Sequence, residues 1–150
     1  MLTDFEFKPT QAQLRAIGAV LKDFQKNQPM ARLLEGDVGS GKTLVAMLAA
    51  FAAIQKGFQV AYMAPTEVLS RQHFQTLTKY FKNFRIKAAL ITSSECLKFP
   101  SKVSPGSPTH ISKSQLLKWV GSGEIPMVVG THALIQDKVK FKNLAFVIID

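Results

Sequence analysis

The sequence predicts a three-layer α/β domain in which a mainly parallel sheet lies between helices. Short apolar segments alternate with segments whose apolar residues recur at helical spacing, which is typical of strands joined by helical crossovers. A glycine-punctuated stretch, residues 36–41, stands between an apolar run and an Ala-rich run. The chain has 150 residues, 47% of them hydrophobic, which suffices for the core of one domain.

In the first part of the chain the sequence predicts helix, strand, glycine turn and helix. The apolar residues of the first helix, 10–27, recur at helical spacing: Leu14, Ile17, Leu21 and Phe24. Thr10 is a suitable N-cap for this helix. Residues 30–34 form a short apolar run, which we expect to be a strand. Residues 43–56 are apolar on nearly all sides and predict a buried helix, with Gly57 as its C-terminal cap.

The rest of the chain continues this alternation. Further strands are expected at residues 59–64, 87–92, 127–130 and 145–149, and helices at residues 67–80 and 114–120. The segment 93–112 is rich in Ser, Lys and Pro. We expect it to leave the sheet as a mobile excursion.

The composition favours a polyanionic partner. The 19 basic and 10 acidic residues give a net charge of +9, which suits nucleic acid, although surface lysines that only interact with solvent remain an alternative. The single cysteine, Cys96, has no partner for an internal disulfide or a zinc site. The N-terminus lacks the pattern of a signal peptide and no apolar run is long enough to span a bilayer, so we expect a cytoplasmic protein without membrane contact.

Residues 36–43, GDVGSGKT, match the phosphate-binding pattern GxxxxGK[ST]. Glycines let backbone N–H groups converge on phosphate oxygens, and the following helix adds the positive end of its dipole. The Lys42 ammonium can reach the β- and γ-phosphates, and the Thr43 hydroxyl can bind Mg²⁺. The residues expected to hold the nucleotide are Gly36, Gly39, Ser40, Gly41, Lys42 and Thr43. The motif alone does not distinguish ATP from GTP, or a kinase, a switch and a motor.

The last predicted strand ends in a carboxylate, Asp150. Phosphate-loop enzymes use an acidic residue at the end of a neighbouring strand to hold Mg²⁺. We therefore expect Asp150 to act with Lys42 in catalysis and with Thr43 in binding the metal. The alternative is an aspartate that only marks the place where a strand meets solvent.

Four blocks of the sequence resemble the RecG family of branched-DNA helicases, which are superfamily 2 motors. They are FKPTQAQLRAI, LLEGDVGSGKTLVAMLAA, VAYMAPTEVLSRQHF and MVVGTHALIQDKVKFKNLAFVIID. The resemblance implies a RecA-like P-loop NTPase fold, ATP and Mg²⁺ as cofactors, and branched or forked DNA as the partner in replication fork rescue, recombination and repair. The transcription–repair coupling translocase Mfd shares part of this pattern and remains an alternative.

The resemblance also implies roles for individual residues. Gln13 corresponds to the glutamine that reads the adenine edge, which would select ATP. The residues implied to contact DNA follow two of the predicted strands: Thr66, Glu67 and Gln72 after the first, and Thr131 and His132 after the second. Taken alone, His73, next to Gln72, would more often be a surface residue than a ligand.

Two features of the family are not found in these 150 residues. The family's metal-binding motif reads Asp-Glu-x-His, of which only Asp150 is present, and the family also has an N-terminal wedge domain and a second RecA-like lobe that supplies an arginine finger. We therefore expect a partial first motor lobe without helicase activity of its own. The alternatives are a fragment that binds ATP and DNA without turnover, or the lobe of an Mfd-like translocase. A phosphate-loop kinase is less consistent with the blocks, because no lid or acceptor site is evident.

Overall fold

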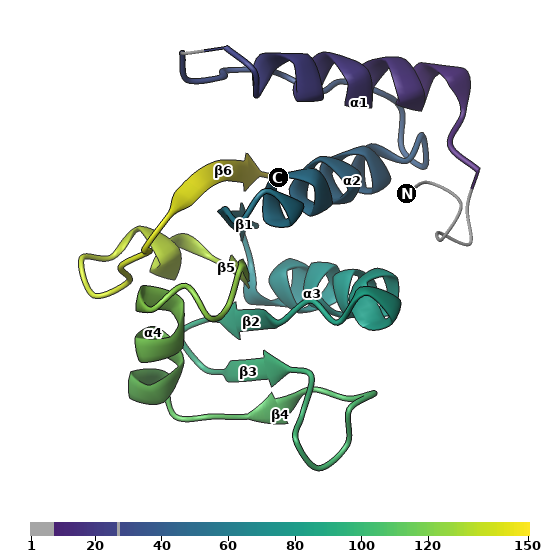
Figure 1. The fold of residues 1–150 in the computed structure, drawn as a ribbon. Helices are drawn as coiled ribbons and strands as arrows, with labels where there is room; N and C mark the ends of the chain where they lie inside the picture. Colours follow the sequence, from purple (N-terminus) through teal and green to yellow (C-terminus); the bar gives the residue numbers. More distant parts are fainter. Residues whose placement is uncertain (1–7, 27) are drawn as a thin grey trace. The chain divides into compact units, whose positions relative to one another are not determined.

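The computed structural model describes residues 8–26 and 28–150, and Figure 1 shows the course of the chain. Phe7 and Asn27, at the bounds of two predicted segments, lie outside the described residues. The chain divides into two compact units, Met1–Ala52 and Ala53–Asp150. Helix α2, Lys42–Gln55, runs from the first unit into the second. Within residues 8–26 and 28–150, no helix has the length and apolar character needed to cross a bilayer.

The first unit begins with helix α1, Gln11–Asp23, in agreement with the predicted helix except that it ends earlier. Thr10 is its N-cap, and the side chain of Gln13 closes a reciprocal capping box with Thr10. The core of this unit joins apolar side chains of α1 and α2: Ile17, Val45 and Leu48, with Ala16, Leu21 and Leu44 beside them. The helical periodicity in the sequence therefore marks the face of α1 that is buried.

The strand predicted at residues 30–34 is not formed, and this prediction is wrong. A strand exists only where its backbone pairs with a neighbour, and a short apolar run does not identify that neighbour. Residues 31–36 are exposed and irregular in the structure.

The second unit is built on a six-stranded sheet with the order β4-β3-β2-β5-β1-β6. Its strands are β1 Gln59–Met63, β2 Ala88–Ile91, β3 Cys96–Phe99, β4 Thr109–His110, β5 Met127–Gly130 and β6 Leu144–Ile149. Its helices are α3 Glu67–Phe81 and α4 Lys113–Gly121, with short 3₁₀ helices η1 Lys82–Phe84 and η2 His132–Ile135. Strands β2, β5, β1 and β6 are parallel to one another. The predicted α/β class with a mainly parallel sheet is confirmed.

Parts of the segment 93–112 belong to the sheet, so the prediction that this segment leaves the sheet is wrong for residues 96–99 and 109–110. Strand β3 pairs antiparallel with β2, and β4 pairs antiparallel with β3. The run CLKF is short and stands among Ser, Lys and Pro residues, so its composition indicates a loop. Its conformation is set by the neighbouring edge of β2, which offers unpaired backbone groups to an adjacent strand.

Alternate side chains of the strands are buried on the two faces of this sheet. On one face Ala89, Ile91 and Val128 form a core cluster with Leu116 and Val120 of α4. The next residues along the same strands point to the other face and are also fully buried, and α3 contacts β2 and β5. Burial on both faces explains why the strands read as continuous apolar runs.

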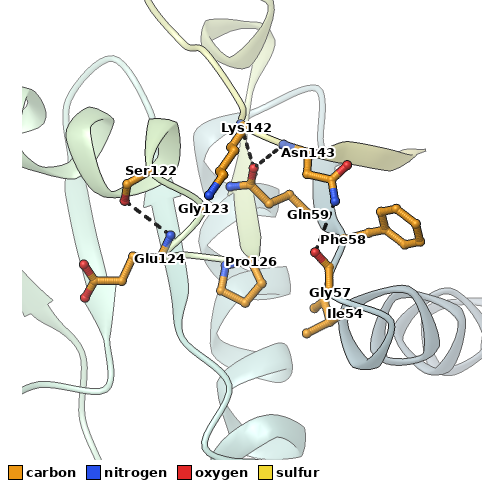
Figure 2. A pocket seen from close by; sticks show the side chains of 10 residues that line it. All are labelled: Ile54, Gly57, Phe58, Gln59, Ser122, Gly123, Glu124, Pro126, Lys142 and Asn143. Carbon is orange, nitrogen blue, oxygen red and sulfur yellow. Dashed lines mark hydrogen bonds between the residues drawn. The ribbon is translucent and has the colours of Figure 1, made fainter.

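The side chain of Gln59 ties three segments together at the amino ends of the strands, and Figure 2 shows its contacts with Lys142 and Asn143. Its Nε2 donates to the carbonyls of Val120 and Ile125 at 2.8 and 2.9 Å. Its Oε1 accepts from the N–H groups of Lys142 and Asn143 at 2.8 and 3.0 Å. The β1–β6 register shifts between Gln59 and the next residue, so this side chain lies where the register of β6 is set.

Candidate nucleotide and polynucleotide contacts

The glycine-rich loop of the first unit has the backbone that a phosphate cradle requires. Gly39 and Gly41 have φ values of 81° and 84°, in the left-handed region that favours glycine. A Cβ at Gly41 would also collide with the Nε2 of Gln13. Helix α2 begins directly after Gly41, so the N–H groups of its first turn follow the loop. This is the arrangement that binds phosphate at a helix N-terminus.

The two predicted side chains of the phosphate loop lie in the first turn of α2. The Lys42 ammonium donates to the carbonyls of Gly36 and Asp37 at 2.5 and 2.9 Å, so it lies over the loop itself. Thr43 is half-buried beside it. A hydroxyl at this position is a hard oxygen ligand, which Mg²⁺ prefers. Within the described ranges no three His, Cys, Asp or Glu side chains gather as a protein-only metal site.

Gln13 connects α1 to the phosphate loop. Its Nε2 donates to the carbonyl of Ser40 at 2.9 Å, and its Oε1 accepts from the N–H of Thr10 at 2.8 Å. A side-chain amide has two N–H groups and two lone pairs on its oxygen. These two contacts leave one N–H and one lone pair of Gln13 for an adenine edge, so the predicted role is compatible with the geometry.

The segment between α1 and the loop is attached by an ion-pair cluster. The Asp23 carboxylate accepts from the Lys26 ammonium at 2.7 Å and from Arg32 Nε at 2.7 Å and Nη2 at 2.5 Å. These bonds, from Lys26 first and then from Arg32, hold the pKa of Asp23 below its ordinary value. The cluster joins the irregular residues before the loop to the end of α1.

In the second unit, the predicted DNA-contact and metal residues follow the carboxyl ends of three adjacent parallel strands. Thr66 comes after β1, Thr131 after β5 and Asp150 after β6. The N–H of Ala64 donates to the carbonyl of Gly130 at 2.9 Å, and the N–H of Asp150 donates to that of Met63 at 2.9 Å. We call this the carboxyl edge of the sheet; ligands of parallel α/β sheets gather at such edges.

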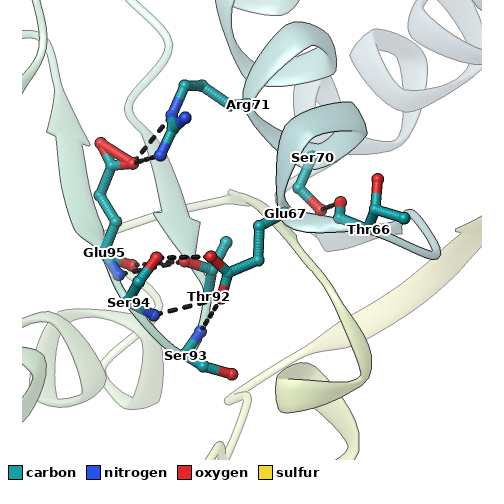
Figure 3. Close-up of polar contacts among 8 residues, drawn as sticks. All are labelled: Thr66, Glu67, Ser70, Arg71, Thr92, Ser93, Ser94 and Glu95. Carbon is teal, nitrogen blue, oxygen red and sulfur yellow. Dashed lines mark hydrogen bonds and ion pairs between the residues drawn. The ribbon is translucent and has the colours of Figure 1, made fainter.

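The predicted DNA-contact residues around the start of α3 differ in exposure and in the hydrogen bonds that their side chains make. Thr66 is exposed and caps α3 by accepting from the N–H of Leu69 at 3.2 Å. Gln72 is exposed. The carboxylate of Glu67 faces the turn between β2 and β3 and accepts hydrogen bonds from Ser93 and Ser94 (Figure 3). The Ser94 hydroxyl first, and then backbone N–H groups, hold the pKa of Glu67 below its ordinary value.

Thr131 and His132 are placed differently from each other. Thr131 is 9% exposed, and its Oγ1 accepts from the N–H of Ala133 at 3.4 Å as the N-cap of η2. His132 is exposed. Gly130, just before them, must be glycine because a Cβ there would collide with the carbonyl of Ile91 on the neighbouring strand. The close approach of β5 to β2 therefore excludes a side chain at the position just before Thr131.

Asp150 has a neighbour that sequence reasoning missed. The Nε2 of His73 lies 2.5 Å from a carboxylate oxygen of Asp150, and the His73 ring packs on Tyr62 with centroids 4.7 Å apart. The His73 side chain is 14% exposed and that of Asp150 is 48% exposed. His73 is therefore largely buried and contacts the carboxylate that was expected to bind the metal. No spacing signal could have found this contact, because the two residues are 77 positions apart.

Comparison with known proteins identifies relatives along almost the whole chain. The sequence model of the DEAD/DEAH box helicases matches residues 10–150. The chain is 48% identical over 144 residues to the ATP-dependent DNA helicase RecG of Aquifex aeolicus. This match covers 96% of this chain and 16% of the relative. It is 44% identical over 149 residues to RecG of Haemophilus influenzae, covering 99% of this chain and 20% of that relative.

RecG of Escherichia coli O157:H7 is 41% identical over 150 residues, covering 100% of this chain and 20% of the relative. The predicted resemblance is thereby confirmed. The chain spans about a fifth or less of the length of these curated relatives.

Proposed function

We propose, from the premise that this chain belongs to the DEAD/DEAH box helicase family, that it is the ATP-binding motor lobe of a DNA helicase acting on branched DNA. The observation that supports this most is the common carboxyl edge, where Thr66, Thr131 and Asp150 follow adjacent parallel strands. The RecG relatives are named ATP-dependent DNA helicases. Replication fork rescue, recombination and repair are the processes in which such an activity would serve.

In this proposal the first unit binds ATP and the metal is Mg²⁺. The loop N–H groups and the Lys42 ammonium would hold the phosphates, the Thr43 hydroxyl would bind Mg²⁺, and the amide of Gln13 would read the adenine edge. Asp150 would help to hold Mg²⁺, the role that acidic residues at strand ends have in P-loop enzymes. When bound, Mg²⁺ would supply positive charge beside the phosphates.

The second unit holds the DNA backbone in this proposal. Hydroxyl groups such as those of Thr66 and Thr131 donate to phosphate oxygens, which positions the protein on the strand without reading its sequence. Gln72 and His132 are exposed beside them and extend the contact. The net charge of +9 favours association with the polyanion. A second RecA-like lobe is the partner against which this lobe would move when ATP is bound and hydrolysed.

A titration with a fluorescent ATP analogue in the presence of Mg²⁺ tests the nucleotide site. Lys42→Ala is expected to weaken binding about 10-fold or more, because a hydrogen bond to a charged group contributes roughly 1.5–3 kcal/mol. Lys56→Ala, just after the end of α2, removes the same charge and is expected to bind the analogue like the wild type. Equal affinities for Lys42→Ala and the wild type would refute the role of this lysine.

A further inference from the structure

The turn between β2 and β3 lies at the carboxyl edge of the sheet, next to the start of α3. It is closed by its own hydrogen bonds: the N–H of Thr92 donates to the carbonyl of Glu95 at 2.9 Å, and the N–H of Glu95 donates to Thr92 Oγ1 at 3.1 Å. Ser93 and Ser94 at its tip are exposed. The sequence-based prediction of a mobile excursion gave no reason to expect an ordered turn at this place.

Glu67 attaches this turn to the first turn of α3 through both of its carboxylate oxygens (Figure 3). Its Oε1 accepts from the N–H groups of Ser93 and Ser94 at 2.9 and 3.2 Å, and its Oε2 accepts from the Ser94 hydroxyl at 2.5 Å. Hydrogen bonds to an ionised acceptor are about twice as strong as neutral ones. Three donors therefore hold the carboxylate toward the turn.

Arg71 makes a second attachment one helical turn further along. Its Nε and Nη2 donate to the same carboxylate oxygen of Glu95 at 2.9 and 2.5 Å. Residues four apart lie on one face of a helix, so Glu67 and Arg71 face the turn together. The Glu95 side chain is 14% exposed, and its pairing shields it from solvent more than an isolated surface carboxylate.

These contacts disfavour a direct role for Glu67 on a polynucleotide. A carboxylate repels phosphate, and this one is already bonded through both oxygens to the turn. Thr66, the adjacent N-cap, is exposed and has a hydroxyl that suits a phosphate. Because Glu67 in the first turn of α3 is bonded to the turn at residues 92–95, this turn helps to set the orientation of the start of α3 and of the adjacent Thr66.

We infer that Glu67 is a positioning residue for polynucleotide binding: it locks the start of α3 to the turn at residues 92–95 and so holds Thr66 in place, without touching the substrate itself. The inference rests on the proposed function, because it assumes that the carboxyl edge binds a nucleic-acid backbone. A locked start of α3 has no ordering cost when the backbone binds, whereas a loosened one must be ordered first.

Two substitutions at Glu67 separate positioning from charge. Glu67→Ala removes all three hydrogen bonds, whereas Glu67→Gln removes only the charge. A glutamine Oε1 can still accept from the two N–H groups of the turn, and its Nε2 can donate to the Ser94 hydroxyl. If Glu67 acts only through its charge near the polyanion, both variants bind DNA more tightly. If it positions Thr66, Glu67→Ala binds more weakly although the net charge has become more positive.

The experiment is a fluorescence anisotropy titration of a forked DNA oligonucleotide with the full chain at one fixed salt concentration. We expect Glu67→Ala to bind about 3- to 10-fold more weakly than the wild type, which corresponds to the cost of ordering one or two side chains, and Glu67→Gln to bind within about 2-fold of it. Glu124→Ala is the charge control, since this exposed carboxylate precedes β5 at the opposite edge and pairs with Lys87. It is expected not to weaken binding.

The outcomes distinguish this inference from the function on which it rests. Wild-type-like or tighter binding by Glu67→Ala would overturn the positioning role alone. Failure of the wild type to bind DNA would overturn the proposed function, and the inference with it. If Glu67→Ala does not fold, Ser94→Ala removes one bond from the turn side and is expected to weaken binding in the same direction. Hydrogen exchange at the Ser93 and Ser94 amides should accelerate in Glu67→Ala but not in Glu67→Gln, and unchanged exchange would count against the attachment.

Discussion

Replacing Gln59 with leucine tests whether the four hydrogen bonds of its side chain, at the amino ends of the strands, stabilise this sheet. Gln59 is 2% exposed, and leucine has a similar size but forms no hydrogen bonds. The carbonyl of Val120 would lose its hydrogen bond from Gln59 but keep the one from the N–H of Gly123, so the loss would cost about 0.5–1.5 kcal/mol of folding stability. The carbonyl of Ile125, which is buried, would lose its side-chain partner at a cost of about 1–3 kcal/mol.

The loss of the two hydrogen bonds that Gln59 Oε1 accepts from backbone N–H groups adds little to this sum. Lys142 and Asn143 are exposed, so water can replace the oxygen of Gln59 at their N–H groups. Gln59→Leu is therefore expected to lower the free energy of unfolding by about 1.5–4.5 kcal/mol. Because Gln59 also lies where the register of β6 is set, the variant should affect β6, the strand that precedes Asp150.

Urea unfolding followed by circular dichroism measures this change, provided that the transition is two-state. Gln75→Leu is the matched control, since Gln75 is exposed on α3 and a surface substitution of this kind changes stability by about 0.5 kcal/mol or less. A Gln59→Leu protein whose stability is within about 0.5 kcal/mol of the wild type would refute the reasoning.

Two further predictions concern the charged contacts of the two units. Hydrogen bonds from Lys26 first, and then from Arg32, lower the pKa of Asp23 in the folded protein. The ionised carboxylate therefore stabilises the fold at any pH above the ordinary carboxyl pKa. This stability is lost as the pH falls through the lowered pKa of Asp23. The melting temperature should therefore change little between about pH 7 and 5 and fall in more acidic buffer, and Asp23→Asn should lose this acid-sensitive part; an identical pH profile would contradict it. His73→Ala removes the contact that orients Asp150 and should raise the Mg²⁺ concentration needed for ATP-analogue binding by about 2- to 10-fold, as outer-shell substitutions at metal sites do; an unchanged Mg²⁺ requirement would count against that role.

The sequence predicts most of this fold because its helices and central strands are locally determined. Helices α1, α2, α3 and α4 have helical periodicity or apolar faces, and Thr10 is the N-cap that was expected. The central strands are apolar runs buried on both faces, which local composition identifies. The class of the fold follows from their alternation with helices.

The errors arise where the outcome depends on a partner distant in the sequence. Residues 30–34 are apolar enough for a strand but are irregular, and CLKF in a polar segment becomes β3 because it pairs with β2. Likewise, the contact of His73 with Asp150 joins two residues that are 77 positions apart in the sequence. Local patterns do not specify such pairings, since the same short run can form a strand or a loop.

The candidate site divides in the same way. The phosphate loop is recognisable because its motif is contiguous and each position has a physical task. Thr66 and Thr131 are predictable as residues that follow strands, because parallel strands bring such positions to one edge. The attachment of Glu67 to Ser93 and Ser94 is not predictable from the sequence, because it requires the order of the strands and the course of a turn 26 and 27 residues away.

The most direct test of the account is hydrogen–deuterium exchange of the full chain with and without forked DNA. We expect slower exchange at the carboxyl edge, in residues 64–69 and 130–135, and unchanged exchange at the opposite edge, in residues 57–59 and 121–126. DNA-dependent protection confined to the opposite edge, or absent from both edges at a saturating DNA concentration, would contradict the claim that the carboxyl ends of these strands hold the polynucleotide.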